Sequence, residues 1–255
     1  MTLSSEMLGL LAPAFFAGLV VASTHIPLGQ EVLRRGIIFI DLAIAQIAAL
    51  GVVVANVFFH IEDGRGVLPV LLALIFALGA GQLFAWLERE APDHQEAFIG
   101  SAFVLSASLS ILLLASDPHG GEHMQGLLAG QILWVNWTQI ILTGFIYTLL
   151  LALWFGMKDK RAKLFFFVFP VMITLSVQLV GVYLVFASLI IPALATVQLT
   201  ARKRTQTGYA IAAISFAGGL IASTIFDFPA GPAIVCCYPF IALLLFLFLK
   251  EKKQA

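Results

Sequence analysis

Hydrophobic residues occupy long, almost unbroken stretches of this chain, and polar residues are concentrated in the short segments between them. A stretch of roughly 17–25 apolar residues is long enough to cross a bilayer as an α-helix. The pattern predicts such helices over residues 8–28, 37–59, 67–87, 97–116, 132–156, 164–180, 182–198, 208–226 and 230–249. The predicted fold class is therefore all-α, a polytopic transmembrane helical bundle of eight to nine spans.

The distribution of basic residues favours nine spans. The sixth and seventh stretches are separated only by Gly181, so they predict either a hairpin near the outer surface or one bent helix. With nine spans, the N-terminus outside and the C-terminus inside, every Lys and Arg except Arg65 lies on the inner side. Positive charge is retained on the cytoplasmic side of membrane proteins. An eight-span chain would export Arg34, Arg35 and the basic residues at 158–163, so we expect the nine-span orientation.

Composition points to lipid as the solvent and argues against several functions. Of the 255 residues, 61% are hydrophobic and 11% are charged, whereas soluble domains carry about 25% charged residues. A net charge of zero provides no basic footprint for a nucleic acid. The sequence has no glycine-rich phosphate loop, no HExxH motif and no Ser/His/Asp arrangement. We expect a single transmembrane domain over residues 1–255, which is not an enzyme.

Asp41 is the only acidic residue that the pattern places inside a span, and every other charged residue is expected in a loop. An intramembrane carboxylate is costly unless it is hydrated, paired or functional. Asp41 could pair with Arg34 or Arg35, or it could face a translocation path. His25, near the same depth, could be a packing residue or a nitrogen donor to a divalent cation. Gln46 lies about 500° further round the helix than Asp41, and it could line the path or bond to a neighbouring helix.

Two polar segments are further candidates. Segment 117–123 is expected outside, where a glycine pair predicts a flexible, solvated loop or a weak metal-collecting mouth; its candidate ligands are Asp117, His119, Glu122 and His123. Segment 158–163 is expected inside, where it either anchors helices against anionic lipid or contacts a cytoplasmic partner. Its charged residues are Lys158, Asp159, Lys160, Arg161 and Lys163.

Several motifs occur in the order found in one known family. The first lies between His25 and Gly51, where a basic pair is followed by an aromatic-Asp segment and then by a glycine. The others are Glu-Ala-Phe-Ile-Gly at 96–100, Gly-Gln-Ile-Leu at 130–133, Val-Gly-Val…Leu-Ile-Ile-Pro-Ala at 180–193 and Pro-Ala-Gly-Pro at 229–232. In these segments the chain resembles the zinc/manganese-type permeases of ATP-binding-cassette importers. The resemblance runs from about His25 to Leu249, and the motif at 180–193 is its most specific part.

The resemblance implies a homodimer around a central pathway in the cytoplasmic (inner) membrane of a bacterium. Two cytoplasmic ATPase subunits and an extracytoplasmic metal-binding protein would complete the importer. ATP binding and hydrolysis in those partners would shift the dimer between outward and inward states. The cargo would be a divalent metal ion, with no cofactor bound permanently. Zinc is favoured if His25 contributes nitrogen, and manganese or ferrous iron if Asp41 and Gln46 act alone.

The chain departs from the family pattern at two places. The family commonly has an Asp followed four residues later by a His, both thought to face the metal. Aligned on Gly51, these positions fall on Leu42 and Gln46, so Asp41 stands one place early and no His follows. The family's acidic cytoplasmic coupling segment is also missing, which leaves 158–163 as the expected ATPase contact. A permease for a chelated metal, such as a siderophore or cobalamin, and a membrane enzyme or assembly factor without a transport role stay open as alternatives.

Overall fold

The structure is a computed structural model that describes residues 5–59, 66–115, 117 and 120–254. Helices account for nearly all of these residues, and no strand occurs among them, which confirms the predicted all-α class. The α-helices are α1 (Ser5–Arg35), α2 (Ile40–Phe59), α3 (Val67–Glu90), α4 (Gln95–Leu114), α5 (Gly120–Ala129), α6 (Trp137–Gly156), α7 (Arg161–Val180), α8 (Val182–Ala195), α9 (Ala201–Phe226) and α10 (Ala230–Gln254). Three short 3-10 helices, η1 (Pro92–His94), η2 (Ile132–Trp134) and η3 (Lys158–Lys160), lie between them.

The helices group into two compact units. Unit 1 comprises residues 1–36, 129–147 and 179–255, and unit 2 comprises residues 37–128 and 148–178. Each unit therefore combines segments that are distant in the sequence. Unit 1 contains α1, α8, α9 and α10, and unit 2 contains α2, α3 and α4 together with most of α7.

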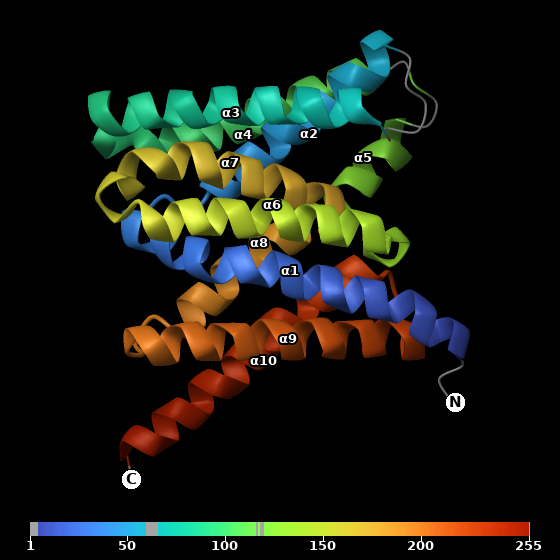
Figure 1. Ribbon diagram of the computed structural model, residues 1–255. Coiled ribbons are helices and arrows are strands. Elements are labelled where there is room, and N and C mark those ends of the chain that lie inside the picture. The colour runs from blue at the N-terminus through green and yellow to red at the C-terminus, as the bar shows by residue number, and fades with distance from the viewer. Residues whose placement is uncertain (1–4, 60–65, 116, 118–119, 255) are drawn as a thin grey trace. The chain divides into compact units, whose positions relative to one another are not determined.

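In unit 1, α1 and α10 each pack against both α8 and α9 (Figure 1). Gly29 allows a close approach of two of these helices, because a Cβ there would overlap the backbone carbonyl of Leu189 in α8. Between α9 and α10, the rings of Phe216 and Tyr238 pack edge to face with centroids 6.1 Å apart. Small and aromatic residues thus set the helix spacing, as is usual between membrane helices.

In unit 2, α2 packs against both α3 and α4 (Figure 1). A Cβ at Gly51 would lie 2.8 Å from the carbonyl oxygen of Leu72 in α3, so only glycine allows this spacing. At the end of the unit where α2 begins, the backbone N–H of Phe39 donates to Glu96 Oε1 at 3.1 Å. Gln95 Nε2 donates to the carbonyl of Phe84 at 3.2 Å. The first bond joins the beginning of α2 to that of α4, and the second joins the beginning of α4 to the later part of α3.

Two helix boundaries have local causes. The predicted span 132–156 is divided, because Asn136 and Gln139 form a capping box that starts α6 at Trp137. The N–H of Gln139 donates to Asn136 Oδ1 at 2.9 Å, and the N–H of Asn136 donates to Gln139 Oε1 at 3.0 Å. Further along, Gly181 has a φ of 82°, which separates α7 and α8 into two helices.

The expectation that every charged residue except Asp41 lies in a loop is wrong. Glu31, Arg34 and Arg35 belong to the last turns of α1, and Glu96 belongs to the first turn of α4. Helices extend beyond their apolar stretches because charged side chains at the ends can reach the polar headgroup region. The glycine pair Gly120 and Gly121, expected in a flexible loop, begins α5 instead.

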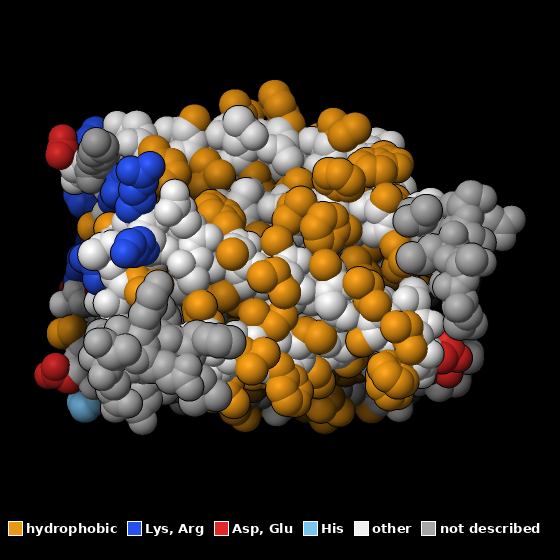
Figure 2. Space-filling model, turned by 90° about the horizontal axis from the view of Figure 1, so that it is seen from below, with side chains coloured by type: hydrophobic (Ala, Val, Ile, Leu, Met, Phe, Trp, Pro, Cys, Tyr) orange, Lys and Arg blue, Asp and Glu red, His pale blue; other side chains and the backbone are white. Residues whose placement is uncertain are grey.

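Seven helices within the described residues are long and apolar enough to cross a membrane: α1, α2, α3, the α4 segment with η1, α6, α7 and α9. Helix α8 has 14 residues, or about 21 Å, less than the roughly 30 Å hydrocarbon core of a bilayer. On the face drawn in Figure 2, hydrophobic side chains cover the middle, and Lys and Arg side chains gather at one end. The chain is therefore a multi-pass membrane protein, but the count of eight to nine spans is not confirmed.

Candidate functional site

Asp41 is completely buried in the first turn of α2. Neither of its carboxylate oxygens has a hydrogen-bond partner of good geometry within the described part of the chain. The backbone N–H groups of Asp41 and Leu42 favour the negative charge of the carboxylate. They lie in the first turn of the helix, where the helix dipole has the same effect. Among the described residues of unit 2, no basic group donates to this side chain.

The two arginines that could have neutralised Asp41 are paired elsewhere. Arg34 Nε donates to Glu31 Oε2 at 2.9 Å, and Arg35 Nε donates to Glu31 Oε1 at 2.8 Å. The Glu31 carboxylate therefore forms ion pairs with both guanidinium groups on one face of α1. Both arginines are thus already paired within α1, and a pairing of either with Asp41 stays a prediction.

Glu96 is the acidic residue that lies near Asp41, and the sequence analysis did not select it. One of its oxygens, Oε1, accepts the hydrogen bond from Phe39. The other, Oε2, is buried and has no hydrogen-bond partner among the described residues. The Glu96 carboxylate is close enough to act electrostatically on Asp41. Only its place in the Glu-Ala-Phe-Ile-Gly motif could have drawn attention to it, because the apolar pattern placed it in a loop.

Gln46 is buried on the same helix as Asp41, with 1% of its surface exposed. Five residues separate the two, which corresponds to about 140° around α2 after one full turn. The structure thus places both predicted side chains inside unit 2, on different sides of one helix. Gln46 stays a predicted member of the path.

His25 lies in unit 1, where it is completely buried. Its Nδ1 is 2.7 Å from Ser188 Oγ, and Ser188 Oγ donates to the carbonyl of Val185 at 3.0 Å. The Ser188 hydroxyl thus links the His25 imidazole to the backbone of α8, whichever of the two side chains donates the proton between them. Ser188 belongs to the motif at 180–193, and the sequence analysis did not select it as a functional residue.

The outer candidates are only partly described. Asp117 precedes α5, and Glu122 is exposed in the first turn of that helix. His119 and the side chain of His123 lie outside the described residues. Within the part of the chain that is described, no three His, Cys, Asp or Glu side chains form a metal-binding group. The proposed metal-collecting mouth therefore stays a prediction.

The inner basic segment consists of η3 and the first turn of α7. Asp159, Lys160 and Lys163 are exposed, whereas the side chain of Lys158 lies outside the described residues. Arg161 Nε donates to the carbonyl of Trp154 at 3.1 Å, and its guanidinium lies 5.7 Å from the centre of the Trp154 ring. Arg161 thus holds the turn between α6 and α7 together, and its exposed neighbours offer charge to a partner.

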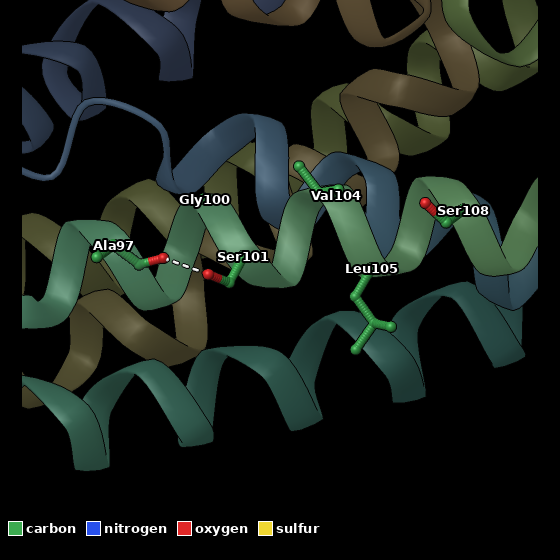
Figure 3. A pocket seen from close by; sticks show the side chains of 6 residues that line it. All are labelled: Ala97, Gly100, Ser101, Val104, Leu105 and Ser108. Atoms are coloured by element: carbon green, nitrogen blue, oxygen red, sulfur yellow. Dashed lines mark hydrogen bonds between the residues drawn. The ribbon is translucent and has the colours of Figure 1, made fainter.

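A shallow, open hollow lies along one side of α4 (Figure 3). Its lining consists of Ala97, Gly100, Ser101, Val104, Leu105 and Ser108. Ser101 Oγ donates to the carbonyl of Ala97 within the helix at 2.8 Å. None of these side chains is acidic, basic or an imidazole, so the hollow has no donor set for a metal ion.

Comparisons with known proteins agree with the motifs. The sequence profile of the ABC 3 transport family matches residues 7–163 and 156–249. The high-affinity zinc uptake system membrane protein ZnuB of Haemophilus influenzae is 25% identical over 96% of this chain and 100% of its own length. ZnuB of Buchnera aphidicola is 24% identical over 93% of this chain and 97% of its own length. A solved structure of PsaBC from Streptococcus pneumoniae in complex with Fab has a TM-score of 0.74 at 20% identity, and it covers 94% of this chain and 93% of that chain.

Proposed function

Because the chain belongs to the ABC 3 transport family, we propose that it is the membrane-spanning permease subunit of an importer for a divalent transition-metal ion, with zinc as the cargo. The observation that carries the proposal is the match to two zinc-uptake membrane proteins over nearly the whole of this chain. The completely buried carboxylate of Asp41 supports it, because an acidic group inside a span is costly unless it has a function such as binding a cation.

The pathway is proposed to use Asp41, Gln46 and His25. Asp41 and Gln46 supply oxygen, and His25 supplies a nitrogen. Zinc accepts both donor types, whereas manganese or ferrous iron is the cargo if only the oxygen donors act. The permease itself performs no covalent chemistry.

The partners follow from the family. Two copies of this chain form the pathway, cytoplasmic ATPase subunits hydrolyse ATP, and an extracytoplasmic protein delivers the metal ion. The exposed charges of Asp159, Lys160 and Lys163 are the proposed ATPase contact. The assembly lies in a bacterial inner membrane, with the N-terminus outside and the C-terminus inside after nine spans, and with segment 117–123 at the outer mouth.

Reconstitution tests this proposal directly. The permease is purified with its ATPase subunits, placed in liposomes and supplied with its metal-binding protein. We expect ATP-dependent accumulation of Zn²⁺, with Mn²⁺ and Fe²⁺ measured in parallel and a chelated metal as the comparison. Accumulation of only the chelate would reject a path for the bare ion, and no ATP-dependent accumulation of any metal would reject the transport role.

A further inference from the structure

The most unusual group of atoms in unit 2 is a pair of carboxylates where α2 and α4 begin. Asp41 comes from the first turn of α2, and Glu96 comes from the first turn of α4. The two interact electrostatically. The Phe39 N–H bond to Glu96 Oε1 fixes Glu96 beside the start of α2. The pair is thus built by tertiary structure from residues that are 55 positions apart in the sequence.

Three oxygen atoms of this pair have no hydrogen-bond partner of good geometry among the described residues. They are both carboxylate oxygens of Asp41 and Oε2 of Glu96, and all three are buried. Buried polar atoms are nearly always satisfied, so each exception calls for an explanation. Two neighbouring carboxylates also repel each other if both are ionised. A cation between them would satisfy the oxygens and remove the repulsion.

We propose that Glu96 is the second carboxylate of a divalent-cation site that it forms with Asp41 at the junction of α2 and α4. The proposal rests on the proposed transport function, because the cation is the imported metal ion on its way through unit 2. Carboxylate oxygens are ligands for Zn²⁺ and, with added water molecules, for Mn²⁺. Glu96 has a second role, since its Oε1 also holds the backbone of Phe39.

Two substitutions separate the charge of Glu96 from its bond to Phe39. Glu96→Gln keeps an oxygen at the Oε1 position for the Phe39 N–H but removes the negative charge. Glu96→Asp keeps the charge but is one methylene shorter, so the bond to Phe39 is lost. If Glu96 binds the cation, the Gln variant is the impaired one. If Glu96 only holds Phe39, the Asp variant is the impaired one and the Gln variant is normal.

The measurement is equilibrium dialysis of Zn²⁺ and Mn²⁺, each alone, against the purified permease–ATPase complex. We expect Glu96→Gln to weaken binding at least about tenfold, as the loss of a metal-supporting group does, and Glu96→Asp to weaken it less. Glu90→Gln is the matched control, because Glu90 is exposed at the end of α3 and carries the same change from acid to amide. Metal binding in Glu96→Gln equal to that in Glu90→Gln would overturn the proposal.

Two further readouts keep the test decisive. If Glu96→Gln does not yield folded protein, the unmodified complex is treated with a hydrophobic carbodiimide, and modified peptides are identified by mass spectrometry. Zn²⁺ or Mn²⁺ should protect both Asp41 and Glu96, and modification of Glu96 that is unaffected by either metal overturns the proposal. Uptake assays separate this inference from the transport function itself. Loss of uptake in Asp41→Asn with normal uptake in Glu96→Gln would reject only the role of Glu96.

Discussion

The contact between Gly51 and α3 predicts how a single methyl group would displace α2, the helix that carries Asp41 and Gln46. In Gly51→Ala, the new Cβ would lie 2.8 Å from the Leu72 carbonyl oxygen and 2.9 Å from the Cα and N atoms of Ala73. Ordinary contact between such atoms is about 3.5 Å. Because the obstructing atoms are backbone, they cannot rotate away, and the two helices must separate by about 0.6 Å or more.

The free energy follows from two opposing effects. Overpacking of this kind costs about 1–3 kcal/mol, whereas Gly→Ala in a helix gains about 1 kcal/mol in helix propensity. Gly79→Ala on α3 is the matched control, since nothing lies within 4 Å of its added Cβ. Gly79→Ala should therefore show only the gain in helix propensity. The difference between the two variants is therefore the overpacking term, about 1–3 kcal/mol.

Thermal unfolding of the purified protein in detergent measures this difference. In soluble domains of similar size, 1 kcal/mol shifts the midpoint by about 2–4 °C, so Gly51→Ala should melt several degrees below Gly79→Ala. Its uptake should also fall, since α2 presents the candidate path residues. Equal midpoints for the two variants would refute the close α2–α3 contact and the reasoning that places α2 by it.

Two other predictions concern unit 1 and the inner basic segment. Ser188→Ala removes the hydrogen-bond partner of His25 Nδ1, and a buried polar group left unsatisfied costs about 1–3 kcal/mol. The expected result is a lower thermal midpoint, and an unchanged midpoint would contradict a stabilising role for this hydrogen bond. Lys160→Glu combined with Lys163→Glu should reduce recovery of the ATPase in co-purification without changing the thermal midpoint of the permease, because both side chains are exposed. Full recovery would remove this segment from the ATPase contact.

The apolar pattern predicted the positions of the long helices because lipid requires a continuous hydrophobic surface over the whole span. It was less informative about where helices begin. The start of α6 depends on the reciprocal hydrogen bonds of Asn136 and Gln139, a capping box that lies between two apolar stretches and has little effect on hydropathy. The separation of α7 from α8 depends on the positive φ of Gly181, which the isolated glycine indicated but did not fix.

The candidate site was predictable only in part, for a different reason. Asp41 stood out because a lone acid in an apolar stretch is rare and costly. Glu96 could not stand out in the same way, since the sequence places it among other charged residues before α4. Its importance arises from tertiary structure, through the Phe39 hydrogen bond and the proximity to Asp41. Ser188 was hidden for the same reason, because its contact with His25 joins helices 163 residues apart.

The most direct test is ATP-driven metal uptake into liposomes by the complete complex carrying Asp41→Asn, compared with Asp93→Asn. Both variants lose one carboxylate charge, but Asp41 is buried in α2 and Asp93 is exposed in η1. The account predicts that the Asp41 variant assembles normally and transports no metal, while the Asp93 variant transports like the unmodified chain. Normal uptake by the assembled Asp41→Asn complex would contradict the role of this carboxylate in the cation path.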